Sequence, residues 1–150
     1  MNGTCSSTPT ATARVLLVED NRLGLAARKA LLEEQSYSVT TAMEGQQALE
    51  LFTGGKFDIV VTDFKMPRMN GKRLIEEIRK ISPATPIIMV SGYAEALGFD
   101  ERNTGADVVI AKSANEVSQL IRAVRRLVQT GRRKPARSDS RSSKRQRKQA

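Results

Sequence analysis

Runs of apolar residues recur along the chain, and a stretch with helical spacing follows most of them. Residues 14–18, 57–62 and 87–90 are almost wholly apolar, which is typical of strands buried on both faces of a sheet. Residues 107–111 form a further short apolar strand, and residues 37–42 alternate more, as an edge strand would. The pattern therefore predicts five strands, one of them at an edge.

Apolar residues at helical spacing fill the segments between the first three strands and the fourth. They predict helices over residues 23–31, 48–52 and 74–81. Asp20 or Asn21 can cap the first of these helices, because a short polar side chain can accept a hydrogen bond from the free N–H groups there. Each predicted strand up to the fourth is thus joined to the next by a helix.

The last two helical segments differ in strength. Residues 92–105 give a poor helix, interrupted by Gly98, and we expect low local stability there. Residues 117–128 have the strongest apolar stripe of the chain. Just before them, Ser113 and Glu116 have the spacing of a capping box. The final helix is therefore predicted to begin at a Ser113 cap.

Five strands alternating with five helices predict an α/β fold with a doubly wound parallel sheet, covered by helices on both faces. In such a sheet ligands bind beyond the carboxyl ends of the strands, at the point where the strand order reverses. We expect residues 14–131 to form one folded domain, residues 1–13 to be a disordered segment, and residues 132–150 to be a basic disordered tail.

Composition excludes several kinds of chemistry. The 150 residues include no histidine and one cysteine, Cys5. A Ser–His or Cys–His dyad, a histidine metal ligand and a disulfide framework are therefore impossible, and the chain cannot be a histidine kinase or a histidine phosphocarrier. No segment has the ~18 apolar residues of a membrane helix, and residues 1–13 lack a signal-peptide pattern. We expect a cytoplasmic protein.

Positive charge is concentrated at one end of the chain. The net charge is +9, yet residues 132–150 hold nine Lys/Arg and one aspartate, so that +8 belongs to the tail and +1 to the rest. The tail has no aromatic residue for base stacking. A solvated tail is one interpretation, and salt-sensitive, non-specific binding to nucleic acid or to an anionic surface is the other.

Polar residues stand at or just beyond the ends of the predicted strands. They are Glu19, Asp20, Asp63, Ser91 and Lys112. Charged residues at strand ends often only meet water, but here five polar residues each follow an apolar run and would face one crevice. Three crowded carboxylates repel one another, and a hard divalent cation such as Mg²⁺ would relieve that repulsion. The sequence therefore predicts an acidic cation site opposite one lysine.

The same residues, in this order, resemble the receiver domain of two-component response regulators, as a single-domain, CheY-like protein. The resemblance rests on Val18-Glu-Asp-Asn21, on Asp63-Phe-Lys-Met-Pro-Arg-Met-Asn-Gly71, on Ser91-Gly92 and on Lys112, and it spans residues 14 to about 130. It implies a flavodoxin-like (βα)5 fold with strand order 2-1-3-4-5. It also implies a signalling protein and not an enzyme in the usual sense.

By this resemblance, Asp63 accepts a phosphoryl group, with Ser91 and Lys112 assisting. Mg²⁺ would be held by Glu19, Asp20, Asp63 and the backbone carbonyl of Lys65. The implied partners are a sensor histidine kinase or phosphotransfer protein and an unknown downstream protein, with the chain a monomer or weak homodimer.

The chain departs from the usual receiver pattern at several positions. Val109 stands where receivers commonly carry an aromatic residue, which puts the familiar coupling to the output face in doubt. Ser113 replaces the usual proline after the lysine, so that the peptide bond is either trans, which could displace Lys112, or cis, at a cost of about 2.5–4 kcal/mol. Lys65 and Tyr93 stand at variable positions that tune access of water to the phosphoryl group.

Three alternatives remain open from the sequence. The chain could be a receiver-fold interaction module that works without phosphorylation, given Val109 and Ser113. It could be a nucleic-acid-associated protein that acts through its basic tail. It could also be a Mg²⁺-dependent phosphohydrolase, although no separate acid–base carboxylate beside Asp63 supports this.

Overall fold

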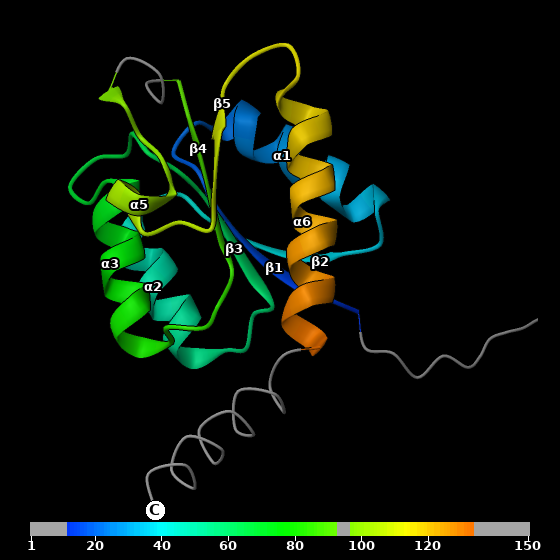
Figure 1. Ribbon diagram of the computed structural model, residues 1–150, viewed down its shortest axis with the longest axis horizontal. Helices are drawn as coiled ribbons and strands as arrows, with labels where there is room; N and C mark the ends of the chain where they lie inside the picture. Colours follow the sequence, from blue (N-terminus) through cyan, green and yellow to red (C-terminus); the bar gives the residue numbers. More distant parts are fainter. Residues whose placement is uncertain (1–11, 93–96, 134–150) are drawn as a thin grey trace, which may run out of the picture.

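A computed structural model describes residues 12–92 and 97–133 of the chain. Five strands form one sheet: β1 (Arg14–Val18), β2 (Ser38–Ala42), β3 (Ile59–Asp63), β4 (Ile87–Ser91) and β5 (Val108–Ala111). The order is β2-β1-β3-β4-β5 and every neighbouring pair is parallel (Figure 1). The predicted doubly wound α/β fold is confirmed, and so is the edge position of the second strand.

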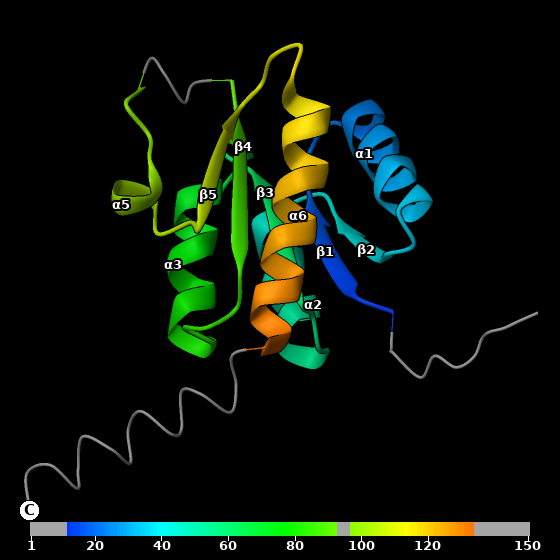
Figure 2. The same cartoon turned by 45° about the vertical axis from the view of Figure 1, so that its right-hand side comes forward.

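Helices cover both faces of this sheet. They are α1 (Arg22–Glu34), α2 (Gly45–Gly54), α3 (Gly71–Ile81), α5 (Glu101–Thr104) and α6 (Glu116–Arg133). Figure 1 shows α1 and α6 on one side of the sheet and α2, α3 and α5 on the other, and the turned view in Figure 2 shows α6 beside α1. Within residues 12–92 and 97–133, every helix is too short or too polar to span a bilayer.

The sheet separates two hydrophobic cores, because successive side chains of a strand point to opposite faces. In β1, for example, Leu16 packs with the helices α2 and α3, whereas Leu17 packs with α1 and α6. Both side chains are almost fully buried, at 0% and 1% exposure. Burial on both faces is why the strands read as continuous apolar runs in the sequence.

Two helices near the carboxyl edge of the sheet begin at asparagine caps. The side chain of Asn21 accepts a hydrogen bond from the N–H of Gly24 at 2.9 Å, and that of Asn70 accepts one from Arg73 at 2.9 Å. These bonds satisfy N–H groups that have no partner inside the helix. The caps fix the residues just after β1 and just before α3, where the polar strand ends meet.

The capping box predicted at Ser113 is wrong in its placement. The hydroxyl of Ser113 accepts from the N–H of Asn115 at 3.3 Å, and α6 begins only at Glu116. The carbonyl of Asn115 accepts from Gln119 at 3.1 Å, which makes Asn115 the capping position. The Glu116 carboxylate pairs with Arg28 of α1, because a cation from a neighbouring helix is a stronger partner than a neutral backbone amide.

The weak helix predicted over residues 92–105 is described only in part. Its described portion is the four-residue α5, which Asp100 caps by accepting bonds from two N–H groups. It ends at Gly105, whose φ of 82° lies in the left-handed region that favours glycine. Residues 93–96, including Tyr93, lie outside the described residues, as do residues 1–11 and 134–150.

Arg79, in the last turn of α3, joins two connecting segments at the amino edge of the sheet. Its guanidinium donates to the carbonyls of Pro83 at 2.9 Å and Thr85 at 2.6 Å, and to that of Gly105 at 2.9 and 3.2 Å. It also pairs with Asp107 at 2.9 Å. One side chain thus satisfies carbonyls in the two segments that lead into β4 and β5, which only the planar fork of arginine can do.

We expect Arg79→Gln to lower the free energy of unfolding by about 2 kcal/mol, because several charge-assisted hydrogen bonds are lost together. Urea unfolding followed by circular dichroism measures this. Arg73→Gln is the matched control on the same helix, since Arg73 is exposed and pairs with Glu77 of the same helix. It should change stability by less than about 0.5 kcal/mol. Equal effects of the two substitutions would contradict the role given to Arg79.

Candidate functional site

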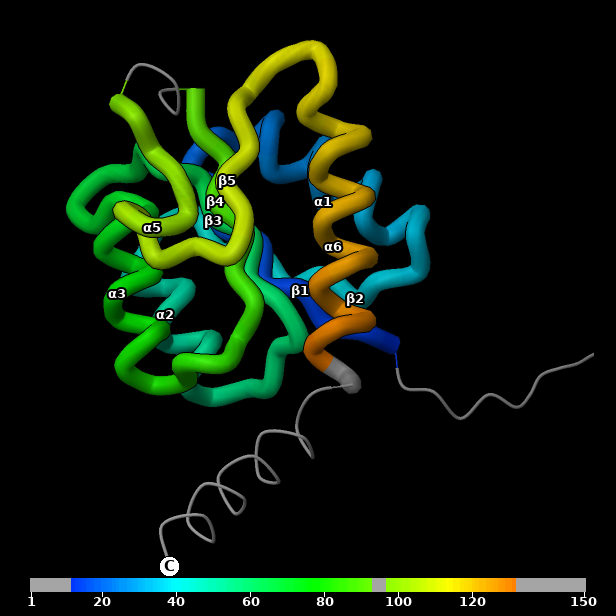
Figure 3. The backbone as a smooth tube through the Cα atoms, in the orientation of Figure 1, coloured from blue at the N-terminus to red at the C-terminus, as the bar shows by residue number. Residues whose placement is uncertain are grey.

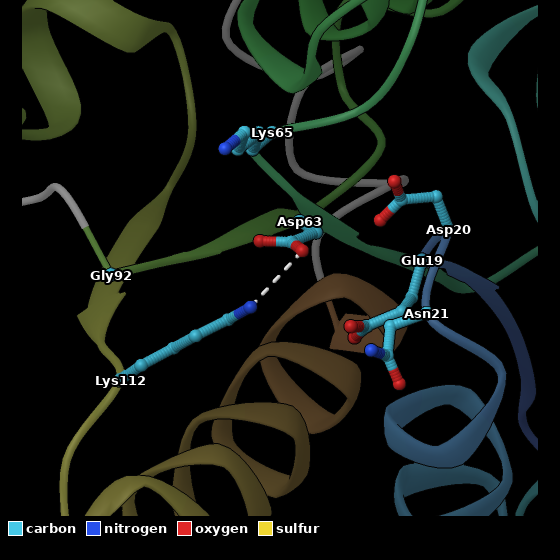
Figure 4. A pocket seen from close by; sticks show the side chains of 7 residues that line it. All are labelled: Glu19, Asp20, Asn21, Asp63, Lys65, Gly92 and Lys112. Atoms are coloured by element: carbon cyan, nitrogen blue, oxygen red, sulfur yellow. Dashed lines mark hydrogen bonds and ion pairs between the residues drawn. The ribbon is translucent and has the colours of Figure 1, made fainter.

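A hollow of about 560 Å³ lies at the carboxyl edge of the sheet (Figure 4). It is lined by Glu19, Asp20, Asn21, Asp63, Lys65, Gly92 and Lys112. These residues come from the end of β3 and from the segments that follow β1, β3, β4 and β5. The segment after β5 arches over towards α6 (Figure 3). The site therefore lies where the strand order reverses, as expected for a doubly wound sheet.

The register of the strands brings the acids together. Val18 of β1 stands beside Thr62 of β3, so that the next residues, Glu19 and Asp63, are neighbours. Carboxylate oxygens of Glu19, Asp20 and Asp63 all lie within 4.8 Å of one another. Glu19 and Asp63 are 3% and 5% exposed, whereas Asp20 is exposed. Two nearly buried carboxylates beside a third form a centre of negative charge that favours a bound cation.

Lys112 reaches into this hollow from the end of β5. Its Nζ donates to Oδ2 of Asp63 at 3.1 Å (Figure 4), while the N–H of Phe64 donates to Oδ1 at 2.9 Å. Both carboxylate oxygens of Asp63 therefore have a donor, which fixes the side chain in place. None of the peptide bonds in the described ranges is cis. The bond before Ser113 is thus trans, and Lys112 nevertheless contacts Asp63.

Ser91 lies deeper than the other predicted site residues. It is the last residue of β4, is 1% exposed, and accepts from the N–H of Lys112 through its carbonyl at 3.1 Å. Gly92, the next residue, lines the hollow. The predicted role of Ser91 as a donor stays a prediction.

Lys65 lines the hollow two residues after Asp63, on the side opposite Glu19 (Figure 4). Its side chain carries positive charge at the rim, and its backbone belongs to the loop that leads away from β3. The expected use of its carbonyl as a metal ligand remains a prediction.

The loop after Asp63 is closed by a direct backbone contact with α3. The N–H of Gly71, the first residue of α3, donates to the carbonyl of Phe64 at 2.7 Å. A Cβ atom at position 71 would collide with the backbone carbonyl oxygen of Asp63 and would lie 3.0 Å from Cα of Phe64. Only glycine permits this approach. Close packing of α3 against the loop therefore requires the glycine that ends the Asp63-to-Gly71 motif.

The donor set fits a hard divalent cation. Three carboxylates supply oxygen ligands, which Mg²⁺ prefers, and the exposed side of the hollow leaves room for water and phosphate oxygens. The described part of the chain offers no histidine and no cysteine here, because the sequence has no histidine and its cysteine is at position 5. The arrangement suits an oxygen-ligated ion beside a nucleophilic carboxylate and a cationic side chain.

Two contacts near the site were not expected from the sequence. Arg28 of α1 forms ion pairs with Glu19 and with Glu116. Gly24, one turn earlier, lies directly against the Glu19 carboxylate. The only sequence signal was a glycine and an arginine four residues apart on one helix, which does not by itself reveal that Glu19 and Glu116 converge there.

Val109, which replaces the usual aromatic residue, is half-buried in β5. It borders a groove of about 320 Å³ between β5 and α6. The side chains of Arg122 and Arg126 also line this groove. A residue this short fills less of the space than an aromatic ring would.

Comparisons with known proteins agree on one family. The sequence profile described as response regulator receiver domain matches residues 15–125. The two-component response regulator ORR42 of rice (Oryza sativa subsp. japonica) is 36% identical over 110 residues, which cover 72% of this chain and 83% of that protein. The sensor kinase CckA of Brucella abortus is 45% identical over 85 residues, covering 55% of this chain.

Solved structures show the same fold. The response regulator TrrA of Thermotoga maritima, in complex with Mg²⁺ and BeF, is 31% identical with a TM-score of 0.69, covering 77% of this chain and 99% of that one. A CheY-like receiver domain protein of Methanospirillum hungatei is 30% identical with a TM-score of 0.74, covering 82% of this chain and 98% of that one.

The matched length differs among the relatives. The alignment spans 83% of the rice regulator but only 9% of the sensor kinase CckA and 50% of the transcriptional regulatory protein DltR of Streptococcus agalactiae. What these relatives share with the chain is therefore the receiver domain. Receiver domains are phosphoacceptors that interact with histidine kinases or phosphotransfer proteins. With this match, this fold and these acids at one sheet edge, the chain belongs to the response regulator receiver domain family of two-component signal transduction.

Proposed function

We propose that the chain is a stand-alone receiver in which Asp63 accepts a phosphoryl group from a sensor histidine kinase or a phosphotransfer protein. The change at Asp63 would switch the conformation of the chain and so control a downstream protein. The observation that carries the proposal is the position of the Asp63 carboxylate, which faces two other acids within 4.8 Å and Lys112 at 3.1 Å.

The transfer itself is a displacement at phosphorus. An oxygen of the Asp63 carboxylate attacks the phosphorus of a donor phosphohistidine in line, and the bond from phosphorus to the histidine nitrogen breaks. The electron pair of that bond stays on the nitrogen. Because the other ring nitrogen of the donor carries a proton, the leaving group is a neutral imidazole, and the product is an acyl phosphate on Asp63. Lys112 compensates charge on the phosphoryl oxygens, and the Ser91 hydroxyl donates to one of them.

A cation favours this chemistry because the acids repel an incoming phosphoryl group. Glu19, Asp20 and Asp63 carry three negative charges; Lys112 pairs with Asp63, and Arg28, which is shared with Glu116, pairs with Glu19. These three carboxylates and the carbonyl of Lys65 would hold Mg²⁺, which would supply positive charge to the phosphoryl oxygens. The Mg²⁺ and BeF in the solved structure of TrrA support this choice of ion.

A metal-removal experiment tests the proposal. We expect the full chain to gain the mass of one phosphoryl group when treated with a small phosphodonor and Mg²⁺, as measured by intact mass spectrometry. With EDTA in place of Mg²⁺ the gain should fall by at least roughly tenfold, because uncompensated carboxylates repel the incoming phosphate. Equal labelling with and without the metal would contradict the proposed cation site.

A phosphorylation-independent interaction module is the principal alternative. It drew support from Ser113, because a trans peptide bond before this residue could displace Lys112. The bond is trans, and Lys112 nevertheless contacts Asp63. The phosphoacceptor proposal is therefore favoured. The proposed boundaries are those expected from the sequence, residues 14–131 for the receiver and residues 132–150 for a basic tail, although α6 continues to Arg133.

A further inference from the structure

Arg28 of α1 links an acid of the site to an acid outside it. Its Nη1 forms an ion pair with Oε1 of Glu19, at the end of β1. On its other side, Nε donates to Oε2 of Glu116 at 2.7 Å, and Nη2 lies 2.6 Å from the same oxygen. Glu116 is the first residue of α6. The three side chains are 11%, 4% and 15% exposed, in the order Arg28, Glu19, Glu116.

The burial of these groups strengthens the interaction between their charges. Oε1 of Glu19 is buried and has no hydrogen-bond partner within the described part of the chain, so that the ion pair with Arg28 is what compensates its charge. A charge pair shielded from water is screened much less than one at the surface. Removal of either partner would leave an uncompensated charge in a poorly solvated position.

Gly24 makes room for this arrangement. It lies one turn before Arg28 on the same face of α1. A Cβ atom at position 24 would lie 2.8 Å from Oε2 and 3.0 Å from Cδ of Glu19. The Glu19 carboxylate therefore rests against bare helix backbone at Gly24 and against the guanidinium of Arg28. We call these two residues of α1 the Glu19 seat.

The Glu19 seat and the cation site both involve the Glu19 carboxylate, so that Arg28 and a bound ion would compete for it. Glu19 has an oxygen within 4.8 Å of oxygens of Asp20 and Asp63, and it is also the partner of Arg28. Arginine has no neutral form in proteins, so the competing charge is permanent. An ion that binds the acids must therefore share Glu19 with Arg28 or draw it away from the seat.

We propose that Arg28 is a positioning residue that competes with Mg²⁺ for Glu19, and that Glu116 moderates this competition by holding Arg28 from its other side. The inference rests on the proposed use of Glu19 as a metal ligand. When Mg²⁺ takes Glu19, Arg28 keeps Glu116 as its partner, so that binding of the ion strengthens the contact between α1 and the start of α6. Lys112 lies four residues before Glu116, in the segment between β5 and α6. The contact between Arg28 and Glu116 therefore helps to hold the segment that positions Lys112.

Metal binding by the full chain tests the competition directly. Isothermal titration with Mg²⁺ should give roughly tenfold tighter binding for Arg28→Gln than for the unaltered chain, because the competing cation is gone. Arg22→Gln is the matched control, since Arg22 is an exposed cation on the same helix. It should change the affinity by less than roughly twofold. No tightening in Arg28→Gln, or equal tightening in both variants, overturns the inference.

Glu116→Gln provides an independent arm that leaves Arg28 in place. It removes the second partner of Arg28, so that Arg28 holds Glu19 more firmly and Mg²⁺ should bind roughly threefold more weakly. In the Arg28→Gln background the same substitution should have almost no effect. An equal loss in both backgrounds would show a general effect of charge and would overturn the inference, even if Arg28→Gln folded poorly.

The outcomes also separate this inference from the proposed function. If the unaltered chain binds Mg²⁺ and Arg28→Gln binds it no more tightly, only the competition is rejected. If neither chain binds Mg²⁺, the cation site itself is rejected and the inference with it. Binding by Arg28→Gln alone supports both, with Arg28 as a strong competitor.

Discussion

Asp63→Asn will abolish labelling of the chain by a small phosphodonor in the presence of Mg²⁺. The amide has almost the same shape as the carboxylate but lacks its negative charge and its nucleophilic oxygen pair. It also ends the ion pair with Lys112, whose Nζ lies 3.1 Å from Oδ2. Intact mass spectrometry, followed by peptide mapping of the unaltered chain, measures both the loss and the site of the label.

Asp58→Asn is the matched control for that substitution. Asp58 directly precedes β3, at the end of the strand opposite Asp63, where its carboxylate accepts from the N–H of Arg14 at 2.8 Å. This variant should be labelled as the unaltered chain is. A label that persists in Asp63→Asn, or a map that places it on another residue, would refute the assignment of Asp63.

Gly71→Ala is the second substitution with a large expected effect, here on stability. The added methyl group would collide with the backbone carbonyl oxygen of Asp63, and a backbone atom cannot move aside as a flexible side chain can. We expect the free energy of unfolding to fall by about 3 kcal/mol, because the start of α3 must separate from the loop. Urea unfolding measures this value.

Gly54 offers the control for the glycine substitution. It is the last residue of α2, and a Cβ atom there would have no atom within 4 Å beyond its two chain neighbours and the backbone of its own helix. Gly54→Ala should therefore leave stability unchanged or raise it by up to about 1 kcal/mol, since alanine favours the helix. If Gly71→Ala were as stable as Gly54→Ala, the close approach at position 71 would not matter for folding.

The fold was largely predictable because its strands are short and buried. A strand covered on both faces must be apolar at every position, so that β1, β3 and β4 stand out as continuous runs. The edge strand β2 could be recognised by its alternation, and its half-buried residues explain that pattern. Boundaries were less certain: Asp107 was expected in the last strand, but its carboxylate accepts from Ile87 and β5 begins one residue later.

The cluster of acids could also be predicted, since parallel strands end at the same edge of a sheet. Glu19, Asp20, Asp63 and Lys112 each stand at or just beyond the end of a strand, and their convergence needs only the strand order. The depth of Ser91 could not be predicted in this way. Whether the last residue of a strand faces the hollow or the interior depends on the twist and register of its neighbours.

The contacts of Arg28 and Arg79 were missed for a different reason. Arg28 meets Glu116, 88 residues away in the sequence, because α1 and α6 lie on the same face of the sheet. Arg79 binds carbonyl groups of three residues in two separate segments. Periodicity reports which face of a helix is apolar, but it does not report which helices become neighbours.

The sheet is a single layer of strands with a separate hydrophobic core on each face. The packing of one core can therefore change without disturbing the other. Leu16 and Leu17 are adjacent in the sequence, yet they belong to different packing layers. The Arg28 contact lies in the layer of α1 and α6, whereas Gly71 lies in that of α2 and α3. Mutations that repack one layer can therefore alter how Glu19 is held while the loop after Asp63 keeps its shape, which gives selection two separate means of adjusting the proposed phosphorylation site.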